Sequence, residues 1–95
     1  MLNFCLDKEI AFELYKITAE KGDSFAQNNI GFLYVSEGGV KRNLKLAIYW
    51  LQNAVANENK YAHDNLGIFY ELGIGVNKDK IKAFELYKKS AEKKI

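Results

Sequence analysis

Hydrophobic and polar residues alternate along this 95-residue chain with the period of an amphipathic α-helix. In one pattern the positions of a single helical face are Ala26, Asn29, Ile30, Leu33 and Tyr34, and this pattern returns 36 residues later. A second pattern starts at Ala11, Ala47 and Ala83. We name helices of the first kind A helices and helices of the second kind B helices. Together the patterns predict five helices and no strands, at residues 7–21 (B), 24–36 (A), 43–57 (B), 60–72 (A) and 79–93 (B).

Short polar side chains precede these predicted helices. Asp7, Asn43 and Asp79 stand before the B helices at intervals of 36 residues, and Asp23 and Asn59 stand before the A helices. Their oxygens are suited to accept hydrogen bonds from the free amides of a first helical turn. Glycines that tolerate a left-handed backbone mark the expected helix ends, at Gly22, Gly38, Gly39, Gly73 and Gly75.

An internal repeat organises the whole chain. AFELYKITAEKG at residues 11–22 recurs as AFELYKKSAEKK at 83–94, with nine of twelve positions identical at a separation of twice 36 residues. One helix pair buries only one side on itself, so neighbouring pairs must stack. We therefore predict an all-α fold, a right-handed α-solenoid of stacked helix-turn-helix repeats, in a single domain over residues 1–95. Its parts are a leading B helix and A/B pairs at 24–57 and 60–93, with Leu14, Trp50 and Leu86 filling the space between helices.

The repeated residues resemble a known family. Ala-x-x-Asn-Leu-Gly-x-x-Tyr, a Gly-x-Gly-Val turn and an Asp form the pattern of the Sel-1-like repeat, a relative of the tetratricopeptide repeat. The best matches here are Ala62, Asn65, Leu66, Gly67, Tyr70, Gly73, Gly75, Val76, Asp79 and Ala83. Glu37 stands where the first copy should have glycine, and the turn proline is absent from both copies. The resemblance implies a module for protein–protein interaction.

Composition and charge narrow the range of partners and locations. The net charge is only +2, and a lysine cluster near the end is interrupted by Asp79, Glu85 and Glu92, so nucleic acid is not expected as the partner. No apolar run approaches the roughly 20 residues of a membrane span. The single cysteine, Cys5, excludes an internal disulfide and fits a reducing compartment. The bias toward lysine over arginine is typical of AT-rich genes, as in some bacteria or protists. We expect a bacterial cytoplasmic protein.

Candidate catalytic residues are sparse. His63 is the only histidine and is expected on the surface, off the buried face of its helix. Cys5 is interpreted as a terminal apolar residue, since no second thiol accompanies it. The paired glycines follow helices and lack a Gly-Lys-Ser/Thr ending, so they are interpreted as turns and not as phosphate loops. We therefore predict no enzyme activity, no cofactor and no metal site.

The sequence supports a binding surface better than it supports a catalytic site. In related solenoids the A helices line the concave side, so residues opposite their buried face become one surface when repeats stack. The helical angle selects Asn28, Phe32, Val35, Asp64, Ile68 and Glu71, flanked by Gln27 and His63. Phe32 and Ile68 are expected either to pack sideways between A helices or to stand exposed as anchors for a peptide segment or a small globular partner.

Three functions fit these patterns to different degrees. The main prediction is a non-enzymatic adaptor or regulator that binds a protein or peptide. The alternative is an immunity or inhibitor protein that neutralises one toxin or effector. A hydrolase or antibiotic-binding activity is suggested by family association alone, and the missing constellation of His, Ser and Cys argues against it.

The ends of the array are a further expected contact region. Each end is a B helix with apolar residues near its open face, among them Phe4, Leu6, Ile10, Leu86 and Tyr87. Repeat arrays need polar caps. We therefore expect that the chain is part of a longer array or that its ends pair between molecules, aided by opposite charge on its two halves.

Overall fold

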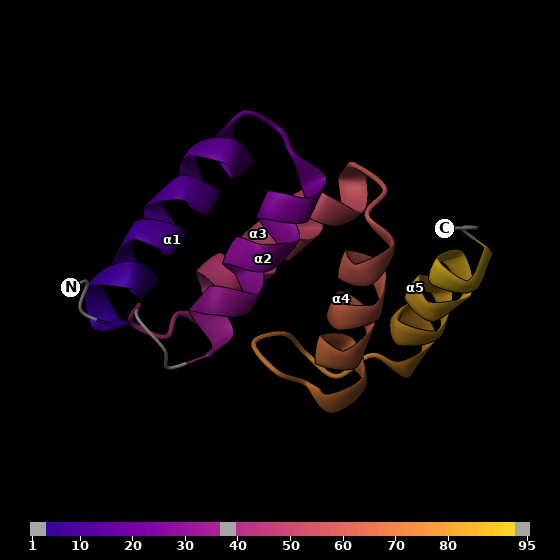
Figure 1. The fold of residues 1–95 in the computed structure, drawn as a ribbon. Helices are drawn as coiled ribbons and strands as arrows, with labels where there is room; N and C mark the ends of the chain where they lie inside the picture. Colours follow the sequence, from indigo (N-terminus) through magenta and orange to yellow (C-terminus); the bar gives the residue numbers. More distant parts are fainter. Residues whose placement is uncertain (1–3, 37–39, 93–95) are drawn as a thin grey trace.

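The computed structural model describes residues 4–36 and 40–92, with side chains described from residue 9 onward. These ranges contain five α-helices and no strand. The helices are α1 (Phe4–Glu20), α2 (Ser24–Val35), α3 (Leu44–Ala56), α4 (Lys60–Leu72) and α5 (Lys80–Glu92). They follow one another from the α1 end to the α5 end of an elongated molecule, 47 × 26 × 19 Å (Figure 1). The predicted solenoid of stacked helices is confirmed, with α2 and α4 as the A helices and α1, α3 and α5 as the B helices.

Four of the predicted N-terminal caps are present. The Asp23 and Asn59 side chains accept hydrogen bonds from the amides of Ala26 (2.9 Å) and Ala62 (3.0 Å). Asn43 and Asp79 cap α3 and α5 in the same way, by accepting from the amides three residues further on. The predicted cap at Asp7 is wrong, because α1 already begins at Phe4 and Asp7 lies inside it.

The turns after the A helices also repeat at 36 residues. The amide of Asn43 donates to the Tyr34 carbonyl (2.9 Å), and the amide of Asp79 donates to the Tyr70 carbonyl (2.8 Å). Gly73 ends α4 with φ of 71°, a left-handed conformation that glycine adopts at little cost. The predicted turn glycines Gly38 and Gly39 lie outside the described residues. Each A helix is thus tied to the start of the following B helix by the same backbone bond.

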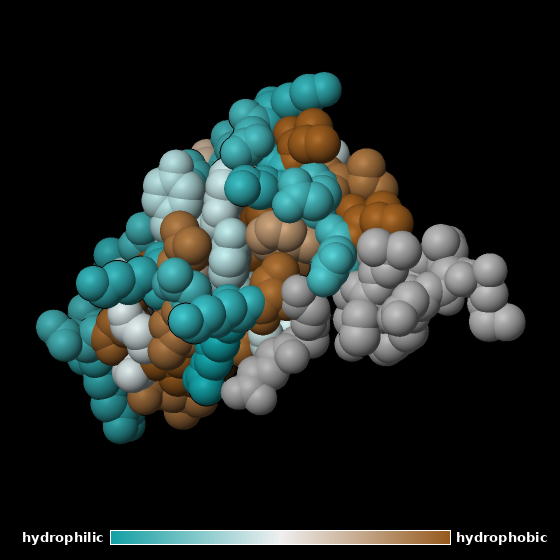
Figure 2. Space-filling view, turned by 90° about the vertical axis from the view of Figure 1, so that its left-hand side faces the viewer, coloured by the Kyte–Doolittle hydropathy of each residue, from teal (hydrophilic) through white to brown (hydrophobic). Residues whose placement is uncertain are grey.

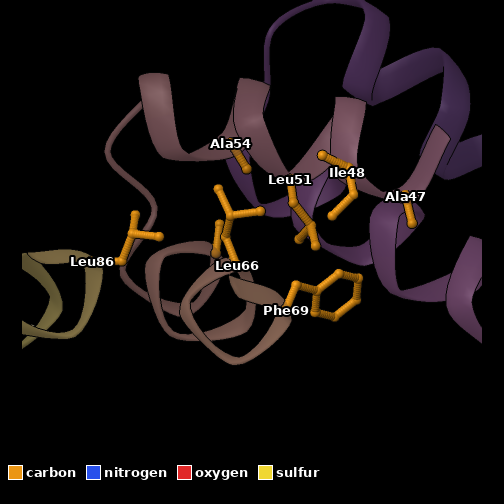
Figure 3. Packing of buried hydrophobic residues seen from close by; sticks show 8 residues of the cluster. Ala47, Ile48, Leu51, Ala54, Leu66, Phe69 and Leu86 are labelled. Atoms are coloured by element: carbon orange, nitrogen blue, oxygen red, sulfur yellow. The ribbon is translucent and has the colours of Figure 1, made fainter. Parts of the chain in front are cut away.

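Two clusters of buried side chains hold the helices together. The larger one joins α3, α4 and α5, and Figure 3 shows side chains of α3 pointing toward those of α4. Its members are Ala47, Ile48, Leu51, Ala54, Ala62, Leu66, Phe69 and Leu86. The smaller cluster, Ala19, Ala26 and Ile30, joins α1 to α2 and is extended by Phe12 and Tyr34, whose rings meet edge to face at 5.5 Å.

Glycines allow the helices of each A/B pair to approach closely. A β-carbon added at Gly31 of α2 would lie 2.9 Å from Leu51 Cγ and 3.2 Å from the Ala47 carbonyl oxygen, both in α3. One added at Gly67 of α4 would lie 2.6 Å from Tyr87 Cε1 in α5. Since any side chain larger than hydrogen would overlap these atoms, glycine sets the spacing within both pairs.

The predicted interior position of Leu14 is wrong. Leu86 and Leu14 occupy the same place in their repeats, yet Leu86 is 8% exposed and Leu14 is 59% exposed. The reason is that α3 and α5 each pack against an A helix that precedes them in the chain, whereas α1 packs against α2, which follows it. One side of α1 is therefore open within the described part of the chain.

Candidate functional site

The outward side of the A helices carries the two predicted anchor residues. The buried residues of α2 share one side of the helix, and Phe32 lies on the opposite side. They are Ala26, Gln27, Ile30 and Gly31. Phe32 is 60% exposed, and Ile68, its equivalent 36 residues later in α4, is 42% exposed. Sideways packing between A helices does not bury these side chains. We name the outward side of α2 and α4 the A-helix face.

Three more large side chains extend this apolar surface, and the sequence prediction missed them. Phe25 of α2 and Tyr61 and Leu72 of α4 are more than half exposed. Phe25 and Tyr61 are equivalent residues, and each lies seven residues, or about two helical turns, before Phe32 or Ile68. The sequence contains a signal for these residues. Each A helix has two large apolar or aromatic residues that are seven positions apart on the side opposite its buried residues, and the pair recurs after 36 residues.

Polar contacts join the two A helices into one surface. The Asn65 side-chain amide donates to Asn28 Oδ1 (3.0 Å), and the Asn59 side-chain amide donates to Ser24 Oγ (3.4 Å). Asn28 and the predicted residue Asp64 are half-buried. The A-helix face therefore consists of exposed apolar side chains with a hydrogen-bonded polar link between them.

The predicted surface positions of Gln27 and His63 are wrong, because both residues are buried. Gln27 donates to the Ala19 carbonyl (3.1 Å) and its oxygen accepts from the Asn57 side chain (3.0 Å). His63 Nδ1 lies 2.7 Å from the Asn59 carbonyl oxygen, which only accepts, so Nδ1 carries the hydrogen and donates. Each A helix packs between two B helices, so its buried arc is wider than one helical stripe and includes these positions.

Val35 also lies differently from its prediction. It was selected for the binding surface, but the structure places it half-buried against the larger core cluster. The apolar surface of α2 therefore centres on Phe25 and Phe32 rather than on its last residue.

Glu71 is exposed at the edge of the A-helix face and is held by a tyrosine. The Tyr87 hydroxyl donates to Glu71 Oε1 at 2.7 Å. Desolvation, this hydrogen bond, and the negative charges of Glu71 and Asp64 raise the pKa of Tyr87 from 10.0 to about 12. The arrangement fixes one carboxylate beside the exposed apolar residues.

We expect Tyr87 to ionise at a pH near 12, as measured by ultraviolet difference absorbance during an alkaline titration. Tyr87→Phe should remove this step, and Glu71→Gln should shift it to lower pH. Because the unfolded tyrosine has the lower pKa, it loses its proton first. The free energy of unfolding should consequently fall as pH rises from 10 toward about 12. Unchanged titration in Tyr87→Phe would contradict this assignment.

A second repeated feature is a pair of clefts between successive B helices. The larger, about 720 Å³, lies between α3 and α5 over His63, and the smaller, about 290 Å³, lies between α1 and α3 over Gln27. Each residue lining the smaller cleft has its equivalent, 36 residues later, in the larger one. Leu86 replaces Trp50 and Lys89 replaces Asn53 in the larger cleft, so the two clefts occupy equivalent positions but differ in size and chemistry.

The described residues offer neither a cluster of metal-ligating side chains nor a membrane-spanning helix. No cluster of three or more His, Cys, Asp and Glu side chains there is placed to hold a metal ion. None of the described helices is long and apolar enough to cross a membrane. The lysines at 78, 80, 82, 88 and 89 are exposed, whereas Lys93, Lys94 and the side chains of Phe4, Cys5 and Leu6 lie outside the described part.

A stack of A/B helix pairs that recurs every 36 residues places this chain in the class of helical-repeat proteins. The Sel1 repeat model matches residues 6–23, 24–59 and 60–94, which is most of the chain. This protein therefore belongs to the Sel1 repeat family, as its resemblance predicted. Sel1 repeat proteins generally mediate protein–protein interactions and are typically non-catalytic scaffolds.

Relatives with Sel1-like sequences come from distant sources. The chain is 42% identical over 67 residues to a sel1-like repeat-containing protein, R815, of Acanthamoeba polyphaga mimivirus, covering 70% of this chain and 12% of that protein. It is 32% identical over 85 residues to the rat DAP3-binding cell death enhancer 1, covering 90% of this chain and 16% of that protein. Since these relatives are viral and animal, bacterial origin and cytoplasmic location stay predictions.

Solved structures share the fold. A Sel1 repeat protein from Oxalobacter formigenes superposes with a TM-score of 0.86 at 30% identity, over 90% of this chain and 35% of that one. The protective antigen c5321 of uropathogenic Escherichia coli gives a TM-score of 0.83 at 34% identity, over 86% of this chain and 18% of that one. The chain thus spans a small part of the proteins it resembles.

Proposed function

We propose that this protein is a non-enzymatic adaptor or regulator whose A-helix face binds an apolar segment of a protein partner. The observation that carries the proposal is the exposure of large apolar side chains at equivalent positions of α2 and α4. Exposed apolar patches bordered by polar groups are typical of interaction sites. Aromatic side chains often provide most of the binding energy.

The polar residues around the patch favour a particular partner chemistry. Asp64 and Glu71 lie on α4, and no lysine or arginine occurs among residues 24–36 of the first A helix and its end. A partner segment with apolar anchors spaced for Phe32 and Ile68, and a basic residue beside α4, complements this surface.

The double variant Phe32→Ser/Ile68→Ser tests this proposal. The immobilised protein should capture a partner from extracts of its source cell, identified by mass spectrometry, and the affinity of that partner for the double variant should fall about tenfold or more. Helicity by circular dichroism should be unchanged, because both side chains are exposed and neither belongs to a core cluster.

Ile81→Ser provides a matched control. Ile81 is an exposed isoleucine on α5, away from the A-helix face. Its replacement removes a similar apolar area and should leave partner capture intact. A partner that binds the Phe32/Ile68 double variant as tightly as the original protein would refute the proposal.

A further inference from the structure

The larger cleft between successive B helices has an unused hydrogen-bond acceptor on its floor. His63 lines this cleft, is only 3% exposed, and donates through Nδ1 to the Asn59 carbonyl oxygen. In the neutral ring the other nitrogen, Nε2, then carries a lone pair. Every fully buried side-chain nitrogen and oxygen among the described residues has a partner, whereas Nε2 bonds to none of them. The lone pair of Nε2 is therefore open to the cleft.

The smaller cleft has no such atom on its floor. Its equivalent residue, Gln27, donates to the Ala19 carbonyl and accepts from the Asn57 side chain. Both ends of this amide are therefore used inside the protein. The open acceptor at His63 is particular to the larger cleft and is not a general property of the repeat.

The larger cleft also carries more carboxylates, three against one. Glu58 and Glu85 line it where the smaller cleft has Gly22 and Tyr49, and Glu92 is the third. The φ of Glu58 is 61°, in the left-handed region that Gly22 adopts at 97°. A side chain at such a position strains the backbone, and strain of this kind is concentrated at functional sites.

The lysines of the cleft do not neutralise these carboxylates. The charged lining residues are the glutamates at 58, 85 and 92 and the lysines at 82 and 89, so one negative charge is in excess. The ammonium of Lys82 also lies over the ring of Tyr70, 5.1 Å from its centre, and is directed at a residue outside the cleft lining. A cation therefore complements this cleft better than an anion does.

Apolar side chains form part of both walls. Val55 of α3 and Leu86 of α5 line the cleft, whose volume is about 720 Å³. The cleft thus has a helix of this chain on each side. In this it differs from the surface at the α1 end, where Figure 2 shows hydrophobic side chains standing among hydrophilic ones.

A fitting ligand needs hydrogen-bond donors for the floor, a positive charge for the carboxylates and an aliphatic part for the walls. An arginine side chain has all three, since its guanidinium is always charged and has five N–H donors and no acceptor. Its planar fork can donate to the floor and to a wall at once. The donors of a lysine leave from a single nitrogen, so lysine meets these requirements less well.

We propose that the cleft between α3 and α5 binds an arginine side chain of a partner protein. One guanidinium N–H donates to His63 Nε2, and others donate to the surrounding carboxylates. The aliphatic stem lies between Val55 and Leu86. The cleft opens between B helices and none of its lining residues belongs to the A-helix face, so this contact is independent of the apolar segment proposed above.

N-acetyl-arginine methylamide is the probe, because it presents the side chain on a peptide-like backbone. In a titration at about pH 8, where imidazole is ordinarily neutral, the ¹⁵N resonance of His63 Nε2 should shift saturably, with a dissociation constant on the order of 1 mM. Glu85→Gln/Glu92→Gln should weaken binding about fivefold or more. Both glutamates are exposed, so this variant should keep its helicity by circular dichroism.

Matched controls separate charge, position and surface. N-acetyl-citrulline methylamide keeps the shape and N–H donors of the probe without its charge and should bind about fivefold more weakly or worse. Glu13→Gln removes an exposed carboxylate at the position of α1 equivalent to Glu85, outside both clefts, and should bind the probe normally. Phe32→Ser/Ile68→Ser should also bind it normally, so the test is independent of the A-helix face.

Four results would each overturn the proposal. They are the absence of a saturable shift at His63, equal binding of the citrulline compound, unchanged binding by Glu85→Gln/Glu92→Gln, and equal or tighter binding of N-acetyl-lysine methylamide. The last result would show that the cleft selects a positive charge without selecting the guanidinium.

Discussion

Replacing Leu86 with alanine is expected to lower the free energy of unfolding by about 3 kcal/mol, whereas Leu14→Ala should lower it by less than about 0.5 kcal/mol. Both leucines lie in the same AFELYK hexapeptide, at equivalent repeat positions. Leu86 is packed in the larger core cluster, and its truncation leaves a cavity among α3, α4 and α5. Leu14 is mostly in solvent already, so little contact is lost.

Urea denaturation followed by circular dichroism measures both changes. The identical local sequence makes Leu14→Ala a control for helix propensity, so the difference between the variants reports packing alone. Equal destabilisation by the two replacements would mean that Leu14 is covered in solution. In that case the open side of α1 would not exist in the isolated chain.

The replacement Gly31→Ala is expected to destabilise the protein by about 2 kcal/mol, although alanine is the better helix former by about 1 kcal/mol. The new methyl group would overlap Leu51 Cγ and press on the Ala47 carbonyl. Leu51 is almost fully buried in the larger core cluster, so moving it would disturb the side chains packed around it. The overpacking therefore exceeds the gain in helix propensity.

Asn29→Ala on the exposed side of the same helix serves as the comparison for Gly31→Ala. It should be neutral or slightly stabilising in thermal and urea unfolding, because alanine replaces a weaker helix former without touching a neighbour. A stabilising Gly31→Ala would show that α2 and α3 can separate without cost. The close contact would then not fix the spacing of the pair.

Local features of this fold were predictable from the sequence because their causes are local. A cap such as Asn59 needs only its own side chain and the amide three residues later, so its position in the sequence was sufficient. The cap at Asp7 failed because the sequence before it also continues as a helix. Helix ends depend on what lies on both sides of the cap residue.

The burial of Gln27 and His63 was not predictable from helical angle alone. The angle orders residues around a helix, but it does not tell how many neighbours the helix has. An A helix with B helices on two sides buries a wide arc, and these polar side chains satisfy their hydrogen bonds inside it. The residues opposite this arc, Phe32 and Ile68, are exposed, which is one of the two outcomes that the helical angle left open.

Residues at equivalent positions of the repeat do not always have the same burial, as Leu14 and Leu86 show. Equivalent residues share a conformation, but they share an environment only if the same neighbours surround them. Among the described helices, α1 packs against an A helix on one side only, so its residues differ in exposure from their equivalents in α3 and α5. The wrong prediction for Leu14 follows from this difference.

The backbone amides of Asn43 and Asp79 each donate a hydrogen bond to a tyrosine carbonyl at the end of the preceding A helix. These repeated bonds have a consequence for how a chain of this kind gains repeats. The bond between Asn43 and Tyr34 lies inside residues 24–59, so a duplicated copy of this segment would carry the bond with it. The new junction would place Ser24 after Asn59, at a position equivalent to Asp23, which precedes Ser24 in the present chain. Recombination within the gene would therefore lengthen the protein in whole units, and each unit would add another row to its outward surface without disturbing the rows already there.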